Sequence, residues 1–160
     1  MAPSDGGGVA GFGNGDISWH DMSVRHSDLS DLDYSRLLEF RTGLRRFLSW
    51  SEQQAAAVGL TPAQHQLLLA VRGSGALPGP TVGDVAQSLL LRHHSAVELI
   101  DRAALLGVVQ RRIDAEDQRV VRVILTPDGE RRLARLSAQS FEELRRLEPR
   151  LRALWKGLDG

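Results

Sequence analysis

The stretch that decides the fold runs from Thr81 to Thr126 and reads TVGDVAQSLLL (81–91), RHHSAVELIDRAALLGVV (92–109) and QRRIDAEDQRVVRVILT (110–126). Thr81 and Asp84 have the spacing of a capping box, which predicts a short helix over residues 81–90. After a two-residue turn, the period of the apolar residues predicts a second helix over residues 93–106.

The third part of this stretch has the composition of a β-hairpin. Two runs rich in β-branched residues, 108–113 and 119–125, flank the polar insert at 114–118. A short helix, a second helix and a charged hairpin, in that order, are typical of a winged helix-turn-helix. In that fold the second helix enters a DNA groove, and here the hairpin would carry arginines beside it.

Helices are also predicted before this stretch. Apolar residues at i, i+3 and i+4 predict an amphipathic helix from Tyr34 to about Val58, which ends at Gly59. Leu60-Thr61-Pro62-Ala63-Gln64 then combines a capping threonine, a proline at the first helical position and a glutamine that completes a capping box. The helix that follows is short, because residues 73–80 contain three glycines and two prolines.

Leu125-Thr126-Pro127 repeats this start signal and opens a C-terminal helix, which Pro149 is expected to divide in two. Its apolar stripe consists of Leu133, Leu136, Phe141, Leu144, Leu147, Leu151, Leu154 and Leu158. Stripes of this kind on both terminal helices favour association, at about 25 cal/mol per Å² of apolar area removed from water. We expect both helices to pack against a second copy of the chain. The alternative is that they pack on each other within one monomer.

The predicted fold class is mostly α, of the α+β type: a winged helix-turn-helix with a two-stranded wing, flanked by N- and C-terminal dimerisation helices. Residues 1–32 are expected to be a flexible, acidic, glycine-rich tail, and residues 33–160 a single domain. Within that domain we assign residues 33–58 and 127–160 to the dimerisation helices, and residues 60–126 to the DNA-binding lobe.

Charge is unevenly distributed, although the net charge is zero. Residues 1–33 hold six acids and one base, so their net charge is −5 and that of the remaining residues is +5. All but one of the 20 basic residues are arginine, whose planar guanidinium suits phosphate and guanine edges. The alternative is that the arginine content reflects genomic base composition.

Several function classes lack support in the sequence. The chain has no cysteine, which removes disulfides, zinc–thiolate sites and thiol-based redox sensing. No apolar run of about 18 residues predicts a membrane span, and the N-terminus does not resemble a secretory signal, so we expect a cytoplasmic protein. No catalytic triad, metal-ligand spacing or phosphate loop is present, so we expect neither an enzyme nor a cofactor or metal site.

A series of short motifs adds a resemblance: Leu60-Thr61-Pro62-Ala63-Gln64, Val85-Ala86 with Leu89, Ile100-Asp101-Arg102, Gly107-Val108-Val109, Arg111-Arg112, Asp114, Asp117, Arg119, Leu125-Thr126 and Gly129. With these motifs, the chain from Leu37 to Leu158 resembles a transcriptional regulator of the MarR (multiple-antibiotic-resistance regulator) family. The resemblance implies a homodimer that binds a pseudo-palindromic operator in double-stranded DNA. It also implies a repressor, released by a small aromatic or phenolic ligand, although activators belong to the family too. The chain departs from the family pattern at Val97 and Glu98, so a base preference is not carried over.

The second helix of the motif supplies the first set of candidate DNA contacts: Arg92, His93, His94, Ser95 and Glu98. A recognition helix presents such N-terminal residues to base edges in the major groove. Glu98 accepts a hydrogen bond from a cytosine amino group in one interpretation, and forms an ordinary i,i+4 ion pair with Arg102 in the other. Adjacent histidines point about 100° apart on a helix, so His93 and His94 are not expected to chelate a metal.

The hairpin supplies the second set, with Arg119 as the central residue. Asp117, two positions earlier, is expected to brace the Arg119 guanidinium, and the resemblance assigns the matching arginine to the minor groove. Arg111, Arg112 and Arg122 are candidate phosphate contacts. The alternative is an ordinary solvated hairpin.

A ligand is expected between the dimerisation helices and the DNA-binding lobe, where it would hold the two recognition helices at the wrong separation. Phe40, Phe47, Trp50 and His65 are the candidates to line this cleft, or else they belong to the core. The alternative function is a winged-helix adaptor that binds proteins rather than specific DNA, which the zero net charge leaves open.

Overall fold

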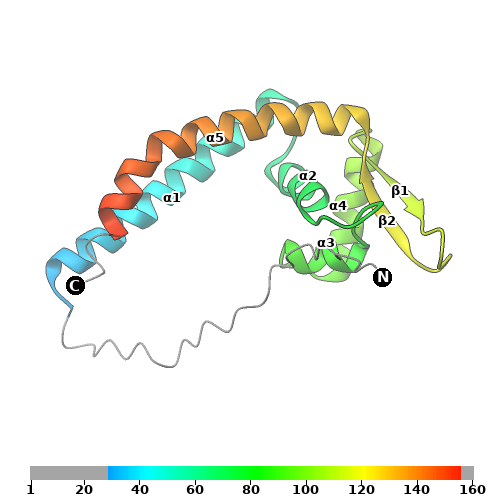
Figure 1. The fold of residues 1–160 in the computed structure, drawn as a ribbon, viewed down its shortest axis with the longest axis horizontal. Helices are drawn as coiled ribbons and strands as arrows, with labels where there is room; N and C mark the ends of the chain where they lie inside the picture. Colours follow the sequence, from blue (N-terminus) through cyan, green and yellow to red (C-terminus); the bar gives the residue numbers. More distant parts are fainter. Residues whose placement is uncertain (1–28, 156–160) are drawn as a thin grey trace, which may run out of the picture. The chain divides into compact units, whose positions relative to one another are not determined.

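A computed structural model describes residues 29–155, so nearly all of the expected tail lies outside the described residues. The chain divides into two units, residues 1–35 and 36–160, and the packing described below belongs to the second. The elements are α1 (Asp31–Ala57), α2 (Pro62–Gly73), α3 (Val82–Ser88), α4 (His93–Leu105), β1 (Val109–Ile113), β2 (Val121–Leu125) and α5 (Pro127–Trp155) (Figure 1). This order confirms the predicted winged helix-turn-helix with its two-stranded wing.

The wing is an antiparallel pair in which Val109 lies opposite Leu125 and Ile113 opposite Val121. It is anchored to the loop before α3, because an isolated bridge joins Thr81 to Arg122, and the Val123 N–H donates to the carbonyl of Pro80 at 2.9 Å. The hairpin is therefore tied at its base to the start of the helix-turn-helix.

The core lies between α2, α3, α4, the wing and the first turns of α5. Leu67 and Leu68 of α2, Ile100 of α4 and Val123 of β2 are completely buried in it. Leu133 and Leu136, which open the predicted stripe of the C-terminal helix, are buried here as well. The N-terminal part of that stripe therefore serves the core of this unit rather than a separate helix surface.

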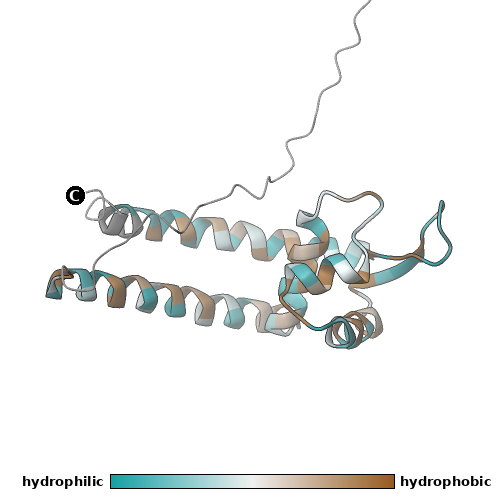
Figure 2. Ribbon diagram, turned by 90° about the horizontal axis from the view of Figure 1, so that it is seen from below, coloured by the Kyte–Doolittle hydropathy of each residue, from teal (hydrophilic) through white to brown (hydrophobic). Residues whose placement is uncertain are grey.

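Farther from the core, the apolar stripes of the two long helices stay in contact with water. Leu37, Leu38, Leu44 and Leu48 of α1, and Phe141 and Leu144 of α5, are all exposed. Apolar residues recur along both helices between polar ones (Figure 2). Within the described residues, the monomer leaves these side chains exposed, contrary to the alternative in which the two helices cover each other.

Local signals explain where two helices begin. Thr61 caps α2, where its hydroxyl accepts from the Gln64 N–H at 3.2 Å and its own N–H donates to the Gln64 side chain at 2.9 Å. Thr81 and Asp84 form the same reciprocal box at the start of α3. Both predicted capping boxes are confirmed. Each satisfies two backbone donors that a helix end otherwise leaves without a partner.

The predicted helix 81–90 is too long, because α3 ends at Ser88. Leu90 has φ of 53°, in the left-handed region, so the chain leaves the helix before this residue. A β-carbon makes that conformation costly, and glycine is its usual occupant. The Leu90 side chain is 93% exposed, so no burial of its own compensates for the strain.

The prediction that Pro149 divides the C-terminal helix is wrong, because α5 continues through Pro149 to Trp155. Proline removes one hydrogen bond to the residue four positions earlier, and its ring crowds that carbonyl. Pro149 is exposed, so water can satisfy the carbonyl that loses its partner. The first helix also differs slightly, since α1 begins at Asp31, three residues before Tyr34.

Gly129 marks the point where α5 meets the start of the wing. A Cβ atom added to Gly129 would lie 2.0 Å from the carbonyl oxygen of Val108, which is far inside van der Waals contact. Thr126 reinforces this junction, because its hydroxyl donates to the Gly107 carbonyl at 2.6 Å and accepts from the Gly129 N–H at 3.1 Å. The absence of a side chain at position 129 therefore sets how closely α5 approaches the wing.

Candidate nucleic-acid interface

Helix α4 buries one face and exposes the other. Ala96, Leu99, Ile100 and Ala103 are in the core, and the exposed polar residues are His93, His94, Glu98, Asp101 and Arg102. Ser95 lies partly buried near the start of the helix. Arg92 is the N-cap residue, is exposed, and makes no side-chain capping hydrogen bond. The structure therefore brings the predicted helix candidates together at the N-terminal end and outer face of α4.

Glu98 and Arg102 lie one turn apart on this exposed face. The distance between Arg102 Nη1 and Glu98 Oε2 is 3.9 Å, and both side chains are more than half exposed. This is the i,i+4 pair that the sequence suggested as an alternative. A pair so exposed stabilises a helix by only about 0.2–0.5 kcal/mol, and at this distance its hydrogen-bonding groups remain available.

Arg111 of β1, a candidate phosphate contact, has partners within the protein. Its Nη2 lies 2.9 Å from Asp101 Oδ1 and donates to the carbonyl oxygen of Val97 at 3.4 Å. Both partners belong to α4, so this arginine joins the wing to the recognition helix. Asp101 belongs to the motifs that carry the resemblance, but the sequence does not predict its partner, because Arg111 becomes a neighbour only after the hairpin folds.

Arg122 of β2 is also occupied within the protein. Its Nε lies 2.7 Å from Asp114 Oδ2, and its Nη1 donates to the carbonyl of Gly79 at 3.2 Å. These side chains are only 24% and 11% exposed. The Arg122 guanidinium holds the wing against the loop before α3, and its expected phosphate contact stays a prediction.

Asp114 organises the tip of the wing. Besides binding Arg122, its carboxylate accepts from the backbone N–H groups of Glu116 at 2.8 Å and Asp117 at 3.2 Å. The hydrogen bond from Glu116, together with the Arg122 guanidinium, lowers the pKa of Asp114 below its usual value. The position of Asp114 between the two β-branched runs predicts that it belongs to the hairpin tip. Its pairing with Arg122 depends on the strand register, which the sequence does not give.

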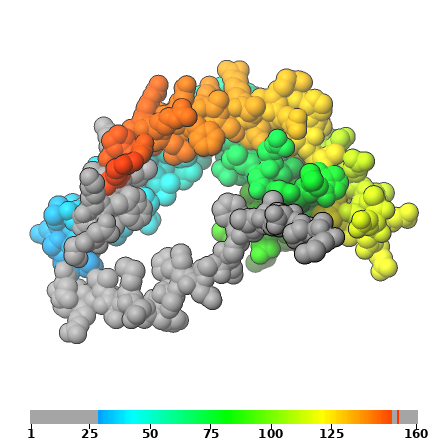
Figure 3. Space-filling model, in the orientation of Figure 1, coloured from blue at the N-terminus to red at the C-terminus, as the bar shows by residue number. Residues whose placement is uncertain are grey.

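Arg119 behaves differently from both of these arginines. Its side chain is 95% exposed, and its Nε lies 3.8 Å from Asp117 Oδ1, beyond a hydrogen bond. Asp117 instead accepts from the backbone N–H of Arg119 at 2.9 Å. The expected brace therefore fixes the backbone at position 119 and leaves the guanidinium extended into solvent. The yellow wing residues stand at the surface in the space-filling view (Figure 3).

The charged residues of this region thus form two sets. Arg111 and Arg122 hold the wing on α4 and on the loop before α3, whereas Arg92, Arg112 and Arg119 are exposed, and in the described residues no side-chain hydrogen bond is recorded for their guanidinium groups. An exposed helix face beside a hairpin with an extended arginine is suited to adjacent grooves of a DNA duplex, the helix in the major groove and the arginine in the minor groove.

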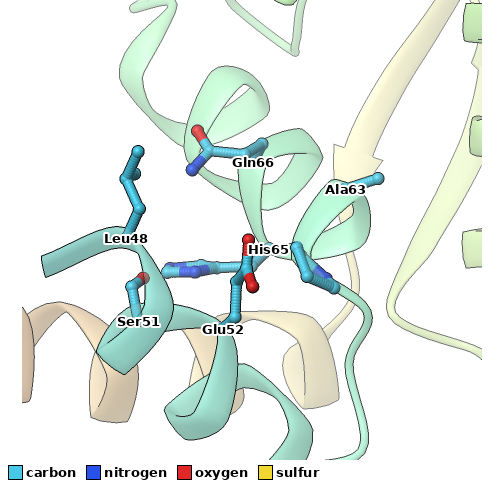
Figure 4. A pocket seen from close by; sticks show the side chains of 7 residues that line it. Leu48, Ser51, Glu52, Ala63, His65 and Gln66 are labelled. Atoms are coloured by element: carbon cyan, nitrogen blue, oxygen red, sulfur yellow. The ribbon is translucent and has the colours of Figure 1, made fainter. Parts of the chain in front are cut away.

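A pocket of about 260 Å³ lies where the second half of α1 meets the start of α2, lined by Leu48, Ser51, Glu52, Pro62, Ala63, His65 and Gln66. The His65 ring extends from α2 toward Ser51 of α1 (Figure 4). His65 is 4% exposed, and within the described residues its Nε2 has no hydrogen-bond partner. Burial lowers the pKa of His65, which favours the neutral imidazole.

The three aromatic candidates for the ligand cleft lie elsewhere. Phe47 and Trp50 stack on each other with ring centroids 5.9 Å apart and rings inclined by 29°. Like Phe40, they are half-buried on α1, and none of the three lines the pocket at His65. Of the four predicted ligand-binding residues, the structure therefore places only His65 in this pocket.

Two further properties of the described residues concern metal ions and membranes. Over residues 29–155, no three His, Asp or Glu side chains converge in a way that would hold a metal ion. In the same part of the chain, every helix is too short or too polar to be a membrane span.

Together, the fold and this charged face are those of a winged-helix protein whose exposed helix and wing suit a DNA-binding regulator. The model of the MarR family matches residues 58–120, which cover α2 to the tip of the wing. Solved structures of MarR-type regulators match the larger part of the chain. The resemblance found in the sequence is confirmed: residues 58–120 match the MarR family model, and the chain has the winged-helix fold of solved MarR-type regulators.

Among solved structures, a MarR family transcription regulator is 23% identical, with a TM-score of 0.66 over 80% of this chain and 86% of that one. The complex of S. aureus MepR with DNA is 21% identical, with a TM-score of 0.59 over 76% of this chain and 97% of MepR. BpsR from Bordetella bronchiseptica is 25% identical, with a TM-score of 0.51 over 65% of this chain and 79% of BpsR. No curated protein sequence matches the chain.

Proposed function

We propose that this protein is a homodimeric, sequence-specific repressor of transcription that acts in the cytoplasm, has no enzymatic activity, and releases its operator when a small molecule binds. The observation that carries the proposal is the 95% exposed Arg119 side chain on a wing that ion pairs hold against α4 and the preceding loop. A hairpin that is anchored at its base and carries an exposed arginine near its tip is suited to insertion into a narrow minor groove. MepR, whose structure includes bound DNA, shares this fold.

The homodimer is supported by the exposed stripes of α1 and α5. Leu37, Leu38 and Leu44 on α1, and Phe141 and Leu144 on α5, form apolar surface that the described monomer leaves in water. Burying such surface stabilises an interface by about 25 cal/mol per Å². A two-fold dimer presents two α4 helices to a duplex, so the half-sites should lie about 10 bp apart, centre to centre.

The ligand part of the proposal is supported by the pocket at His65. A neutral, buried imidazole nitrogen without a partner is costly to leave unsatisfied, and a ligand that supplies a hydrogen bond would remove this cost. The pocket joins α1, proposed as a dimer helix, to α2 of the DNA-binding lobe. The DNA binding of BpsR is regulated by 6-hydroxynicotinic acid, so a small ring compound is a reasonable class of ligand to screen here.

The experiment is a footprint on DNA selected by the purified protein from a random library. We expect two protected half-sites about one helical turn apart, and an affinity that falls steeply as salt is raised. Protection of a single half-site would contradict the dimer. DNA binding that is independent of both sequence and salt would contradict the proposal of a sequence-specific regulator. It would favour a protein-binding adaptor, the alternative that the zero net charge leaves open.

A further inference from the structure

The middle of the exposed face of α4 carries two opposite charges side by side. Arg102 Nη1 lies 3.9 Å from Glu98 Oε2, and the side chains are 61% and 67% exposed. On the same helix, Asp101 makes a much closer pair with Arg111 of β1 at 2.9 Å, and this pair joins two elements. The first pair lies within one helix, and its contribution of about 0.2–0.5 kcal/mol to helix stability leaves it able to serve another role on this face.

The distance leaves the hydrogen-bonding capacity of both groups available. Charge-assisted hydrogen bonds between nitrogen and oxygen span about 2.7–2.9 Å, and 3.9 Å exceeds that range. The Glu98 carboxylate offers only acceptors, and the Arg102 guanidinium offers only donors. Glu98 and Arg102 therefore present a hydrogen-bond acceptor and a donor, close together, to a molecule that binds the exposed face of α4.

We propose that Glu98 and Arg102 together read one C·G base pair in each half-site. This rests on the proposed function, in which α4 lies in the major groove. There cytosine presents its N4 amino group as a donor, and its partner guanine presents O6 and N7 as acceptors. These two base edges lie about 3 Å apart, because a Watson–Crick hydrogen bond joins them. Charged groups 3.9 Å apart match that spacing with small side-chain adjustments.

The same chemistry disfavours the other three base pairs. Thymine O4 and guanine O6 are acceptors and would repel the Glu98 carboxylate at the cytosine position. Adenine has an amino group there, but its N7 acceptor stands beside it, and its partner thymine offers Arg102 one acceptor instead of two. Discrimination therefore comes from repulsion of the wrong bases as well as from attraction to the right one.

The test is selection of bound sequences from random DNA by the wild type, Glu98→Gln and Arg102→Gln, with Glu130→Gln as the matched control. Glu130 is an exposed acid in the first turn of α5, away from the α4 face. We expect an invariant C·G pair in each wild-type half-site. Both α4 variants should relax this same position, and the control should keep it. With the wild type, replacing the pair by T·A in both half-sites should weaken binding at least tenfold, and with Glu98→Gln much less.

Three outcomes would overturn the assignment: no invariant C·G pair in the wild-type half-site, relaxation at two different positions, or unchanged selection by both variants. Because the two side chains are more than 60% exposed, the variants should retain the wild-type circular dichroism spectrum and melting temperature. If the wild type enriches no sequence at all, the proposed function itself fails. Relaxation by neither variant in an otherwise well-defined operator refutes only the reading by Glu98 and Arg102.

Discussion

Replacing Arg119 by alanine separates binding from folding. The Arg119 guanidinium is 95% exposed and makes only a long, 3.8 Å contact with Asp117, so its removal should leave the free energy of unfolding unchanged within error. The backbone N–H of Arg119, which donates to Asp117, is kept in the variant, so the wing tip should keep its shape. We therefore expect the substitution to lower the affinity for DNA without lowering the stability of the protein.

The size of the expected loss in operator affinity follows from the number of arginine–DNA contacts that the substitution removes. Each dimer would lose two arginines from the minor groove, and we expect operator affinity to fall at least tenfold, which is about 1.4 kcal/mol. If each arginine also displaces one counterion, the slope of log K against log salt should decrease by about 1.8 for the pair. A change in both quantities distinguishes a direct DNA contact from a general loss of stability.

The assay is a gel-shift titration on the selected operator at several salt concentrations. Arg131→Ala is the matched control, because Arg131 is 70% exposed on α5 and binds Asp128 within the same helix, at 3.1 Å. The control should bind like the wild type. Wild-type affinity in Arg119→Ala would remove the wing from the mechanism, and an equal loss in both variants would show that only total charge matters.

Three further changes test the fold. Gly129→Ala should lower the melting temperature by several degrees, since its Cβ would lie 2.0 Å from the Val108 carbonyl; a wild-type melting curve would show that α5 can shift freely. Leu90→Gly should be neutral or slightly stabilising, because it relieves a φ of 53° at a side chain that is 93% exposed, and a clear loss of stability would mean that this side chain packs against something. Burial lowers the folded-state pKa of His65, so the unfolded chain binds a proton more readily and the free energy of unfolding should fall as pH drops below about 6.5. In His65→Leu this acid dependence should be smaller in chemical denaturation, and an identical pH profile would contradict it.

The amino-acid sequence by itself determined the order of the elements and most of their boundaries. Caps such as Thr61 with Gln64, and Thr81 with Asp84, act over three residues, and apolar periods act over a few turns, so both can be read from the chain. The two local errors involve backbone conformations that the residue type disfavours: the left-handed Leu90 and the proline inside α5. Residue type alone does not predict where a chain adopts such a conformation.

Only the tertiary structure decided which arginines are free to meet DNA. Arg111, Arg119 and Arg122 look alike in sequence, but Arg111 binds Asp101 on another helix, and Arg122 binds Asp114 across the hairpin, while Arg119 extends into solvent. Those partners are set by strand register and by the packing of the wing on α4, which bring together residues that are not neighbours in the chain. The physical reason is that charge is a property of a residue, whereas its availability depends on which opposite charge the fold places beside it.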